Sequence, residues 1–164
     1  MATKQKNLSD YTNKNIKDIS KTKFGVIVSE WNEQITEALY SGTFQTLLDF
    51  GAQKSNIVRL DVPGCFELPL GAQWLAKRNK IDAVICLGCV IQGETRHFEF
   101  ICQSTAHGIT HVGLKYDKPV IFGVLTTDTM QQAIDRAGGK HGNKGDEAAI
   151  TAIKMLGNRG NKKK

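Results

Sequence analysis

The 164-residue sequence lacks the features that mark membrane, secreted and multidomain proteins. It has no apolar stretch of about 18 residues, the length that a membrane-spanning helix needs. Its polar, lysine-rich start has no apolar segment typical of a secretion signal, and neither an internal repeat nor a domain linker is evident. We therefore expect a protein of the cytoplasm with no membrane partner.

The chain has a net charge of +6, and its two ends contain few acidic residues. Residues 1–23 carry six lysines and two aspartates, and residues 157–164 carry four basic residues and no acidic one. These ends contribute +8, so the residues between them are slightly acidic. Such tails favour solubility over reading a nucleic acid, and we expect no nucleic-acid partner. Arg136, Lys140 and Lys144 suit a small anion better than a polymer.

Length and composition indicate one domain with a sizeable core, since 40% of the residues are hydrophobic. Residues 1–21 are rich in Lys, Asn and Asp and show no apolar period. We predict a mobile basic tail there, a single domain over residues 22–158, and a second basic tail at residues 159–164.

Strands and helices are predicted to alternate along the domain. Short apolar, β-branched runs predict strands at residues 24–28, 57–60, 83–87 and 119–125. Apolar residues at helical spacing predict four helices. The first ends before Gly51, the second begins at Pro69, the third runs from His97 to about Tyr116, and the last follows residue 145. Thr129 and Gln132 form a capping-box pattern for a short helix ending near residues 138–139. This order predicts an α/β fold, a three-layer α/β/α sandwich around a four-stranded parallel sheet with flavodoxin-like topology.

One strand-to-helix turn, GCVIQGETRHF at residues 88–98, has the residues of a reaction centre. Free backbone N–H groups and the helix dipole attract an anion at such a turn, and Gly93 allows a ligand close approach. His97 follows, and histidine is the side-chain type whose ordinary pKa lies near physiological pH. The alternative is that His97 is a solvated or capping residue.

The other loops at the same predicted edge of the sheet supply further candidates, because ligands bind at the carboxyl ends of parallel strands. They are Trp31 and Asn32, then Cys65, Phe66 and Glu67, and finally Phe122 with the end of its strand at residues 126–127. Aromatic rings can sandwich a flat heterocycle, and Glu67 can accept hydrogen bonds from hydroxyls. The alternatives are a surface cap for Trp31, a core role for Phe122 and a helix-dipole partner for Glu67.

Cysteine and histidine spacings give little support for a metal. Cys86 and Cys89 form a C-x-x-C, but no second pair follows at zinc spacing, so reduced and packed thiols are the simpler interpretation. His107 and His111 lie four residues apart on one predicted helix without a third ligand nearby. We expect neither a metal site nor a cofactor.

Four ordered motifs give the chain a specific resemblance. They are PGCFELP at residues 63–69, GCVIQGETRHF at 88–98, PVIFGVLT at 119–126 and RAGGKHGNKG at 136–145. Over about residues 22–158 the sequence resembles the lumazine synthase family, the 6,7-dimethyl-8-ribityllumazine synthases of riboflavin biosynthesis. Two positions depart from the family pattern: Trp31 stands where Phe is commoner, and Cys65 where Ala is commoner.

The resemblance implies a reaction and a set of residues. The reaction condenses 5-amino-6-(D-ribitylamino)uracil with 3,4-dihydroxy-2-butanone 4-phosphate, releasing phosphate and two waters. His97 is expected to transfer protons. The phosphate is expected to bind Glu94, Thr95, Arg136 and Lys144. The expected ribitylaminouracil residues, with Asn32 added from the loop pattern, are Trp31, Asn32, Cys65, Phe66, Glu67, Cys89, Val90, Ile91 and Phe122.

The resemblance also implies assembly. Active sites in this family lie between adjacent subunits of a pentamer, which gives Arg136 and Lys144 a place in a neighbour's site. The short link at residues 136–145 favours a 60-subunit icosahedral shell, and riboflavin synthase is a candidate partner. The alternative function is a non-enzymatic flavin or lumazine carrier on the same fold, which would not need His97, Arg136 and Lys144 together.

Overall fold

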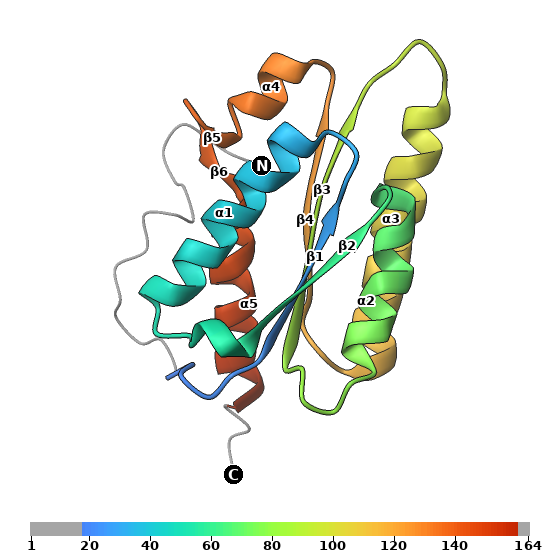
Figure 1. Cartoon of the computed structure of the whole chain (residues 1–164). Coiled ribbons are helices and arrows are strands. Elements are labelled where there is room, and N and C mark those ends of the chain that lie inside the picture. Colours follow the sequence, from blue (N-terminus) through green and yellow to red (C-terminus); the bar gives the residue numbers. More distant parts are fainter. Residues whose placement is uncertain (1–17, 161–164) are drawn as a thin grey trace.

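A computed structural model describes residues 18–160 of the chain (Figure 1). Its centre is a four-stranded parallel sheet in the order β2-β1-β3-β4. The strands are β1 (Phe24–Ser29), β2 (Ile57–Val62), β3 (Ala83–Ile91) and β4 (Val120–Thr127). This order matches the first four strands of the flavodoxin-like arrangement. The predicted parallel sheet is therefore confirmed.

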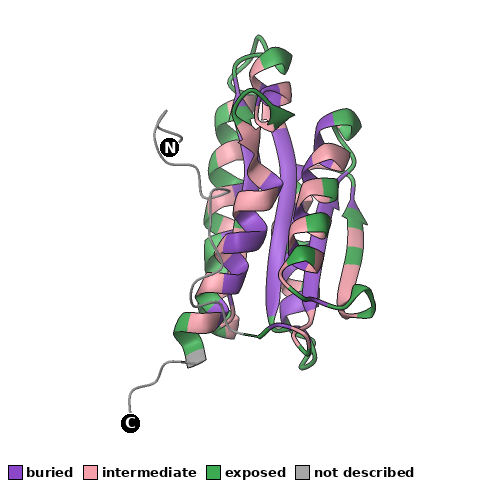
Figure 2. Ribbon diagram, turned by 90° about the vertical axis from the view of Figure 1, so that its left-hand side faces the viewer, coloured by how far each residue is buried: buried purple, intermediate pink, exposed green. Residues whose placement is uncertain are grey.

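Helices cover both faces of the sheet, as Figures 1 and 2 show. One face carries α1 (Glu33–Asp49), α4 (Met130–Ile134) and α5 (Lys144–Gly160), and the other carries α2 (Leu68–Ala76) and α3 (His97–Tyr116). Two short 3-10 turns, η1 (Lys54–Asn56) and η2 (Cys65–Glu67), lie on either side of β2. The three-layer α/β/α architecture is confirmed.

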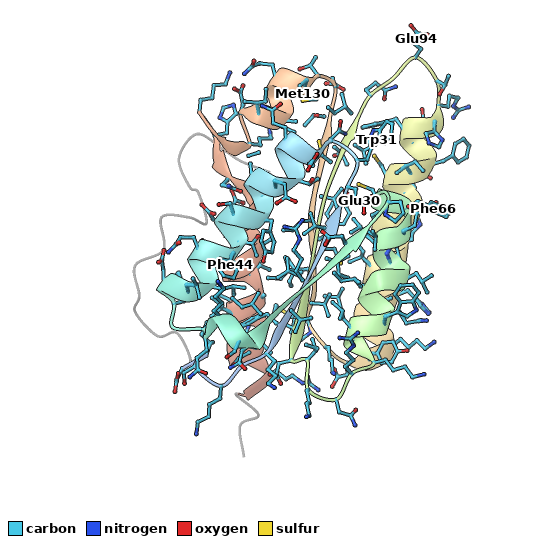
Figure 3. The ribbon with its side chains drawn as sticks, viewed as in Figure 1. Glu30, Trp31, Phe44, Phe66, Glu94 and Met130 are labelled. Atoms are coloured by element: carbon cyan, nitrogen blue, oxygen red, sulfur yellow. The ribbon has the colours of Figure 1, made fainter. Side chains whose placement is uncertain are left out.

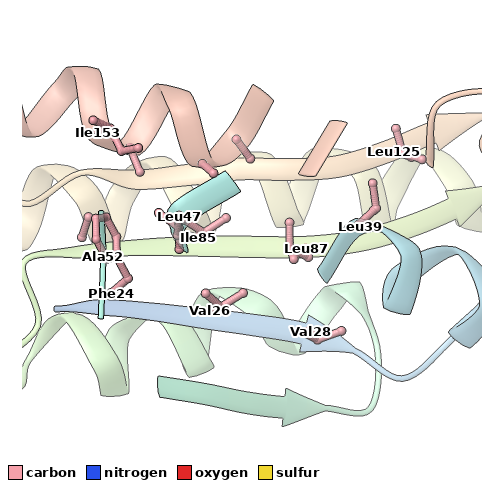
Figure 4. Packing of buried hydrophobic residues seen from close by; sticks show 14 of the residues in the cluster. Phe24, Val26, Val28, Leu39, Leu47, Ala52, Ile85, Leu87, Leu125 and Ile153 are labelled. Atoms are coloured by element: carbon pink, nitrogen blue, oxygen red, sulfur yellow. The ribbon is translucent and has the colours of Figure 1, made fainter. Parts of the chain in front are cut away.

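Strand alternation divides the core between the two faces. In β1, Phe24, Val26 and Val28 pack toward α1 and α5, whereas Ile27 packs toward α2 and α3. Figure 4 shows the first of these clusters, in which Ile85 and Leu87 of β3 join the β1 residues. Because successive side chains of a strand point to opposite faces, the apolar runs of β1 and β3 fill both layers of core.

Local sequence signals set several helix ends. Gly51, at φ 96°, follows the last turn of α1, where a positive φ suits glycine. The Thr129 hydroxyl accepts a hydrogen bond from the Gln132 N–H at 3.2 Å and caps α4, as the capping-box pattern predicts. Pro69 lies in the first turn of α2.

The structure corrects three predicted boundaries. β3 continues through Gly88 to Ile91, because Val90 and Ile91 pair with Thr126 and Thr127 of β4, and the turn is therefore shorter than predicted. α4 ends at Ile134, before the predicted glycines. The predicted glycine-rich link is instead a small antiparallel hairpin of β5 (Ala137–Gly139) and β6 (Gly142–Asn143).

The stretch predicted as the N-terminal tail contains one core residue. Ile19 is fully buried in the core cluster beneath α1 and α5, although it lies within the stretch predicted to be a tail. Residues 1–17 and 161–164 of the predicted tails lie outside the described residues, whereas residues 159 and 160 of the second predicted tail belong to α5. Among residues 18–160, no helix is both long and apolar enough to span a membrane.

Candidate functional site

The loops that follow β1, β2 and β3 enclose one cavity of about 780 Å³. It lies at the carboxyl ends of the strands, beside β1 and β3, where the strand order reverses direction and where open α/β sheets bind ligands. Ten of the fourteen predicted site residues line it: Trp31, Asn32, Cys65, Phe66, Glu67, Cys89, Val90, Ile91, Thr95 and His97. Its volume suits a ligand of the size of a substituted heterocycle.

The loop after β1 supplies an exposed ring on a fixed backbone. The Trp31 side chain is at the cavity wall, and the residue is 73% exposed. Its backbone N–H donates to the Pro63 carbonyl at 3.2 Å. Asn32 has a left-handed backbone at φ 62°, which asparagine tolerates better than most residues. Its side-chain Nδ2 donates to the Cys89 carbonyl at 3.0 Å. Asn32 thus ties the Trp31 loop to the end of β3.

The η2 turn after β2 carries three of the lining residues. Phe66 is 57% exposed, whereas the Cys65 thiol is buried and lies 3.7 Å from the Ser29 hydroxyl. The Cys65 sulfur occupies the space over Gly88, since a Cβ at Gly88 would lie 2.6 Å from that sulfur. Glycine at position 88 therefore makes room for this thiol within the strand.

Glu67 places a carboxylate at the cavity. It is the residue before α2, yet its side chain makes no capping hydrogen bond, and no described residue donates a hydrogen bond to it. The alternative role of Glu67, a partner for the helix dipole, explains its position at the start of α2. That role still leaves both carboxylate oxygens available for hydrogen bonds. A carboxylate in this state can accept hydrogen bonds from ligand hydroxyls.

The turn after β3 brings the candidate proton carrier to the same cavity. His97 is exposed and begins α3, so the positive end of that helix dipole lies at this wall. The backbone N–H of His97 donates a long hydrogen bond of 3.4 Å to the Thr95 hydroxyl. Gly93 also lines the cavity, and no described atom lies within 4 Å of a Cβ placed there, which leaves space beside the turn. Glu94 is at the tip of the loop, away from the cavity lining, as Figure 3 shows.

Three further predicted residues lie elsewhere on the chain. Phe122 is the third residue of β4, opposite Cys86, about 10 Å back along the strand from the level of Cys89. Its ring is 42% exposed on the edge strand. Arg136 and Lys144 flank the β5–β6 hairpin and are joined by a backbone hydrogen bond of 2.9 Å from the Lys144 N–H to the Arg136 carbonyl.

Contacts with α4 and within α5 hold both cations in defined positions. Arg136 Nη1 donates to the Gln132 carbonyl at 3.0 Å, and Lys144 Nζ pairs with Glu147 at 2.6 Å. Neither residue lines the cavity, so the structure does not bring the fourteen predicted residues together within one chain. We refer to Phe122, Arg136 and Lys144 as the β4–hairpin set.

Some cavity residues were not predicted from the sequence. Phe98 and Ile101 of α3 line the cavity, although the sequence analysis placed them only within a predicted helix. Pro63 and Gly64 also line it. The sequence could have indicated them, because they directly precede the predicted site residues of η2. The apolar share of the wall is therefore larger than the loop pattern indicated.

The cysteines behave as packed thiols. Cys86 packs toward α2 and α3 while Cys89 packs toward α1 and α5, so the C-x-x-C side chains lie on opposite faces of the sheet. Burial raises the pKa of both thiols, that of Cys89 to about 12. Among residues 18–160, no group of three or more His, Cys, Asp and Glu side chains is placed to hold a metal ion.

Comparison with known proteins gives one consistent family. Residues 21–159 match a family model described as 6,7-dimethyl-8-ribityllumazine synthase. The 6,7-dimethyl-8-ribityllumazine synthase of Cytophaga hutchinsonii is 65% identical over 156 residues, which cover 95% of this chain and 98% of that protein. The enzyme of the same name from Parabacteroides distasonis is 54% identical over the same coverage of both chains. That of Flavobacterium johnsoniae is 53% identical over 94% of this chain and 82% of its own length.

Proposed function

The chain belongs to the 6,7-dimethyl-8-ribityllumazine synthase family, and we propose that its cavity binds the pyrimidine while a neighbouring copy completes the phosphate end. It is a transferase of riboflavin biosynthesis. It condenses 5-amino-6-(D-ribitylamino)uracil with 3,4-dihydroxy-2-butanone 4-phosphate and releases phosphate and two waters. The observation that supports our assignment of roles is that Trp31, Glu67 and His97 line one cavity.

The pyrimidine lies between apolar walls in this proposal. The exposed Trp31 ring stacks on the heterocycle, and Cys65, Phe66 and the β3 end at residues 89–91 contact its edges. The free carboxylate of Glu67 accepts hydrogen bonds from the ribityl hydroxyls. Asn32 Nδ2 donates one hydrogen bond to the Cys89 carbonyl, so its amide oxygen and its second N–H are available to the ligand.

His97 transfers the protons of the condensation. The substrate amine attacks the ketone to give an imine, phosphate leaves by elimination, and ring closure gives the lumazine. Each step moves a proton to or from nitrogen, carbon or oxygen, which an imidazole near neutral pH can relay directly or through water. Holding the two substrates in register contributes as well, on the order of 7 kcal/mol.

The phosphate end needs cations that the cavity lacks. The Glu94–Thr95 segment lies beside the start of α3 and offers backbone donors and the Thr95 hydroxyl. We assign the positive charge to Arg136 and Lys144 of a neighbouring copy, because neither residue lines the cavity of its own chain. A guanidinium binds phosphate through two parallel hydrogen bonds and stabilises the charge that develops as phosphate leaves.

Exposed apolar side chains support the assembly that this proposal needs. Phe100 and Leu114 of α3 are 64% and 79% exposed, and Leu70 and Trp74 of α2 also lie in solvent. Apolar side chains of this size are commonly buried between subunits. We propose a pentamer, with a 60-subunit shell as the larger particle. Riboflavin synthase as a partner and the cytoplasm as the location stay predictions.

The direct experiment is turnover by the purified, assembled protein. Incubation with both substrates should produce the fluorescence of 6,7-dimethyl-8-ribityllumazine and release one phosphate for each product. A carrier would bind lumazine without forming it, and a nucleic-acid binder would show affinity that falls steeply with salt. Binding without turnover would replace our proposal with the carrier.

A further inference from the structure

Thr105 makes an unusual contact for a threonine in the middle of a helix. Its side chain is fully buried, and its Oγ1 donates to the Cys65 carbonyl at 3.0 Å, across 40 residues of sequence. A threonine within a helix more often donates to a carbonyl one turn earlier in the same helix or faces solvent. The hydroxyl of Thr105 instead joins α3 to the η2 turn.

The acceptor is a carbonyl at the start of the turn that carries cavity residues. The Cys65 carbonyl also accepts the backbone N–H of Leu68, so two hydrogen bonds hold it. Phe66 and Glu67 follow directly and line the cavity, whereas Thr105 itself does not. A change at Thr105 therefore reaches the ligand indirectly, through η2 or through the α3 residues that line the cavity.

A second contact, one turn along α3, lies where α2 begins directly after η2. A Cβ at Gly108 would lie 2.6 Å from side-chain carbons of Pro69, so glycine is needed for α3 to approach α2 here. Packing against Pro69 limits the distance between the segments, and the hydrogen bond of Thr105 fixes their position along the helix axis. His97 lies eight residues before Thr105, about 12 Å along the same helix.

We propose that Thr105 is a positioning residue that sets the distance between His97 and the η2 turn through its hydrogen bond to the Cys65 carbonyl. The inference rests on the proposed function, in which Phe66 and Glu67 bind the pyrimidine and His97 moves its protons. Small displacements of reacting groups are costly in catalysis. Loss of the bond therefore weakens use of the pyrimidine without touching the phosphate end.

The test compares Thr105→Val, which keeps the shape and removes the hydroxyl, with Thr105→Ser, which keeps the hydroxyl. The valine variant should raise the KM for ribitylaminouracil about tenfold, the effect of losing one buried hydrogen bond. The KM for the butanone phosphate should stay within about twofold of the parent value, because that substrate contacts other residues. The serine variant should restore pyrimidine KM to within about threefold.

Matched controls separate positioning from general destabilisation. Thr36 is also a fully buried helical threonine, but its hydroxyl bonds only to Glu33 of its own helix, so Thr36→Val should leave both KM values unchanged. If Thr105→Val does not assemble, Thr105→Ala and Thr105→Ser give the same comparison, since both lose the methyl group. A lower Tm with an unchanged pyrimidine KM would overturn the inference.

Glu67→Gln distinguishes failure of this inference from failure of the proposed function. If Glu67→Gln raises the pyrimidine KM and the hydroxyl-free Thr105 variants do not, the positioning role is wrong while the assignment of η2 stands. If Glu67→Gln also leaves the pyrimidine KM unchanged, the assignment of η2 and the inference built on it are both wrong.

Discussion

The cavity and the β4–hairpin set differ in what each offers a ligand. The cavity has a large exposed ring, a free carboxylate and a histidine, but none of the arginines and lysines of residues 18–160 lines it. The β4–hairpin set has another exposed ring, Phe122 of β4, and two cations that flank the hairpin and are held by contacts with α4 and within α5. Figure 1 shows the hairpin on the α1 and α5 side of the sheet, whereas α3 lies on the other side.

Neither group of residues has all the side chains that the proposed reaction needs. Each has an aromatic ring, but the proposed proton carrier lines the cavity and the proposed phosphate-binding cations flank the hairpin. A condensation that expels phosphate needs both. Because one chain keeps them apart, the simplest arrangement places the cavity of one copy against the β4–hairpin set of the next.

The largest effect is expected from removing the proton carrier of the cavity. His97→Ala should lower kcat about 100- to 10,000-fold, the usual contribution of a positioned general acid or base. Dissociation constants for both substrates, measured by calorimetry, should change less than about threefold, since the walls remain. His107→Ala, an exposed histidine of the same helix, is the control and should have normal kcat. A normal kcat for His97→Ala would remove His97 from the mechanism.

A smaller loss is expected from removing the cation of the hairpin. Arg136→Ala should lower kcat/KM for the butanone phosphate about 10- to 100-fold, because a hydrogen bond to a charged group contributes about 1.5–3 kcal/mol. Pyrimidine affinity should be unchanged in steady-state and binding assays. Arg159→Ala is the matched control, since Arg159 pairs with Asp117 near the far ends of α3 and α5. Equal losses for the two substrates would contradict the division between the regions.

A modest effect is expected from the ring of the β4–hairpin set. Phe122→Ala should weaken pyrimidine binding about two- to tenfold, the range for loss of one aromatic contact. Titration of the substrate against the assembled protein measures it. Met155→Ala removes a side chain of similar exposure on α5 and should bind normally. Unchanged affinity for Phe122→Ala would exclude this ring from the pyrimidine site.

The smallest effect is expected from reagents that modify Cys89, a thiol that lines the cavity. Burial raises the pKa of Cys89 to about 12, so at pH 8 almost all of this group is the unreactive thiol. Iodoacetamide at pH 8 should leave turnover intact, and modification of Cys89 should speed up as the pH rises toward the raised pKa. Mass spectrometry identifies the sites, with denatured protein as the control. Rapid inactivation at pH 8 that substrate prevents would show a reactive thiol in the cavity.

Much of the fold was predictable because its signals are local. The Thr129–Gln132 cap, the end of α1 at Gly51 and the apolar strands each depend on residues close in sequence. The length of β3 depends instead on pairing with β4, so glycine at position 88 suggested a turn where the strand continues. The β5–β6 hairpin is too short and glycine-rich for a strand pattern to appear.

The candidate site was predictable to the extent that it lies in loops after strands. Residues of the first three loops meet at the cavity because parallel strands end at one edge. Phe122 does not, since it lies near the start of β4, three residues before the level of Cys89. Thr105 lies within the helix that the sequence predicts from His97 to about Tyr116, but its contact with Cys65 depends on tertiary packing that no sequence period indicates.

Subunit complementation tests the central claim most directly. His97→Ala and Arg136→Ala chains, each nearly inactive alone, are unfolded together in equal amounts and reassembled, with each variant reassembled separately as the control. If the cavity of one copy works with the hairpin of the next, random mixing restores about one site in four and close to a quarter of parent activity. Activity that stays at the average of the two variants would contradict a site shared between copies.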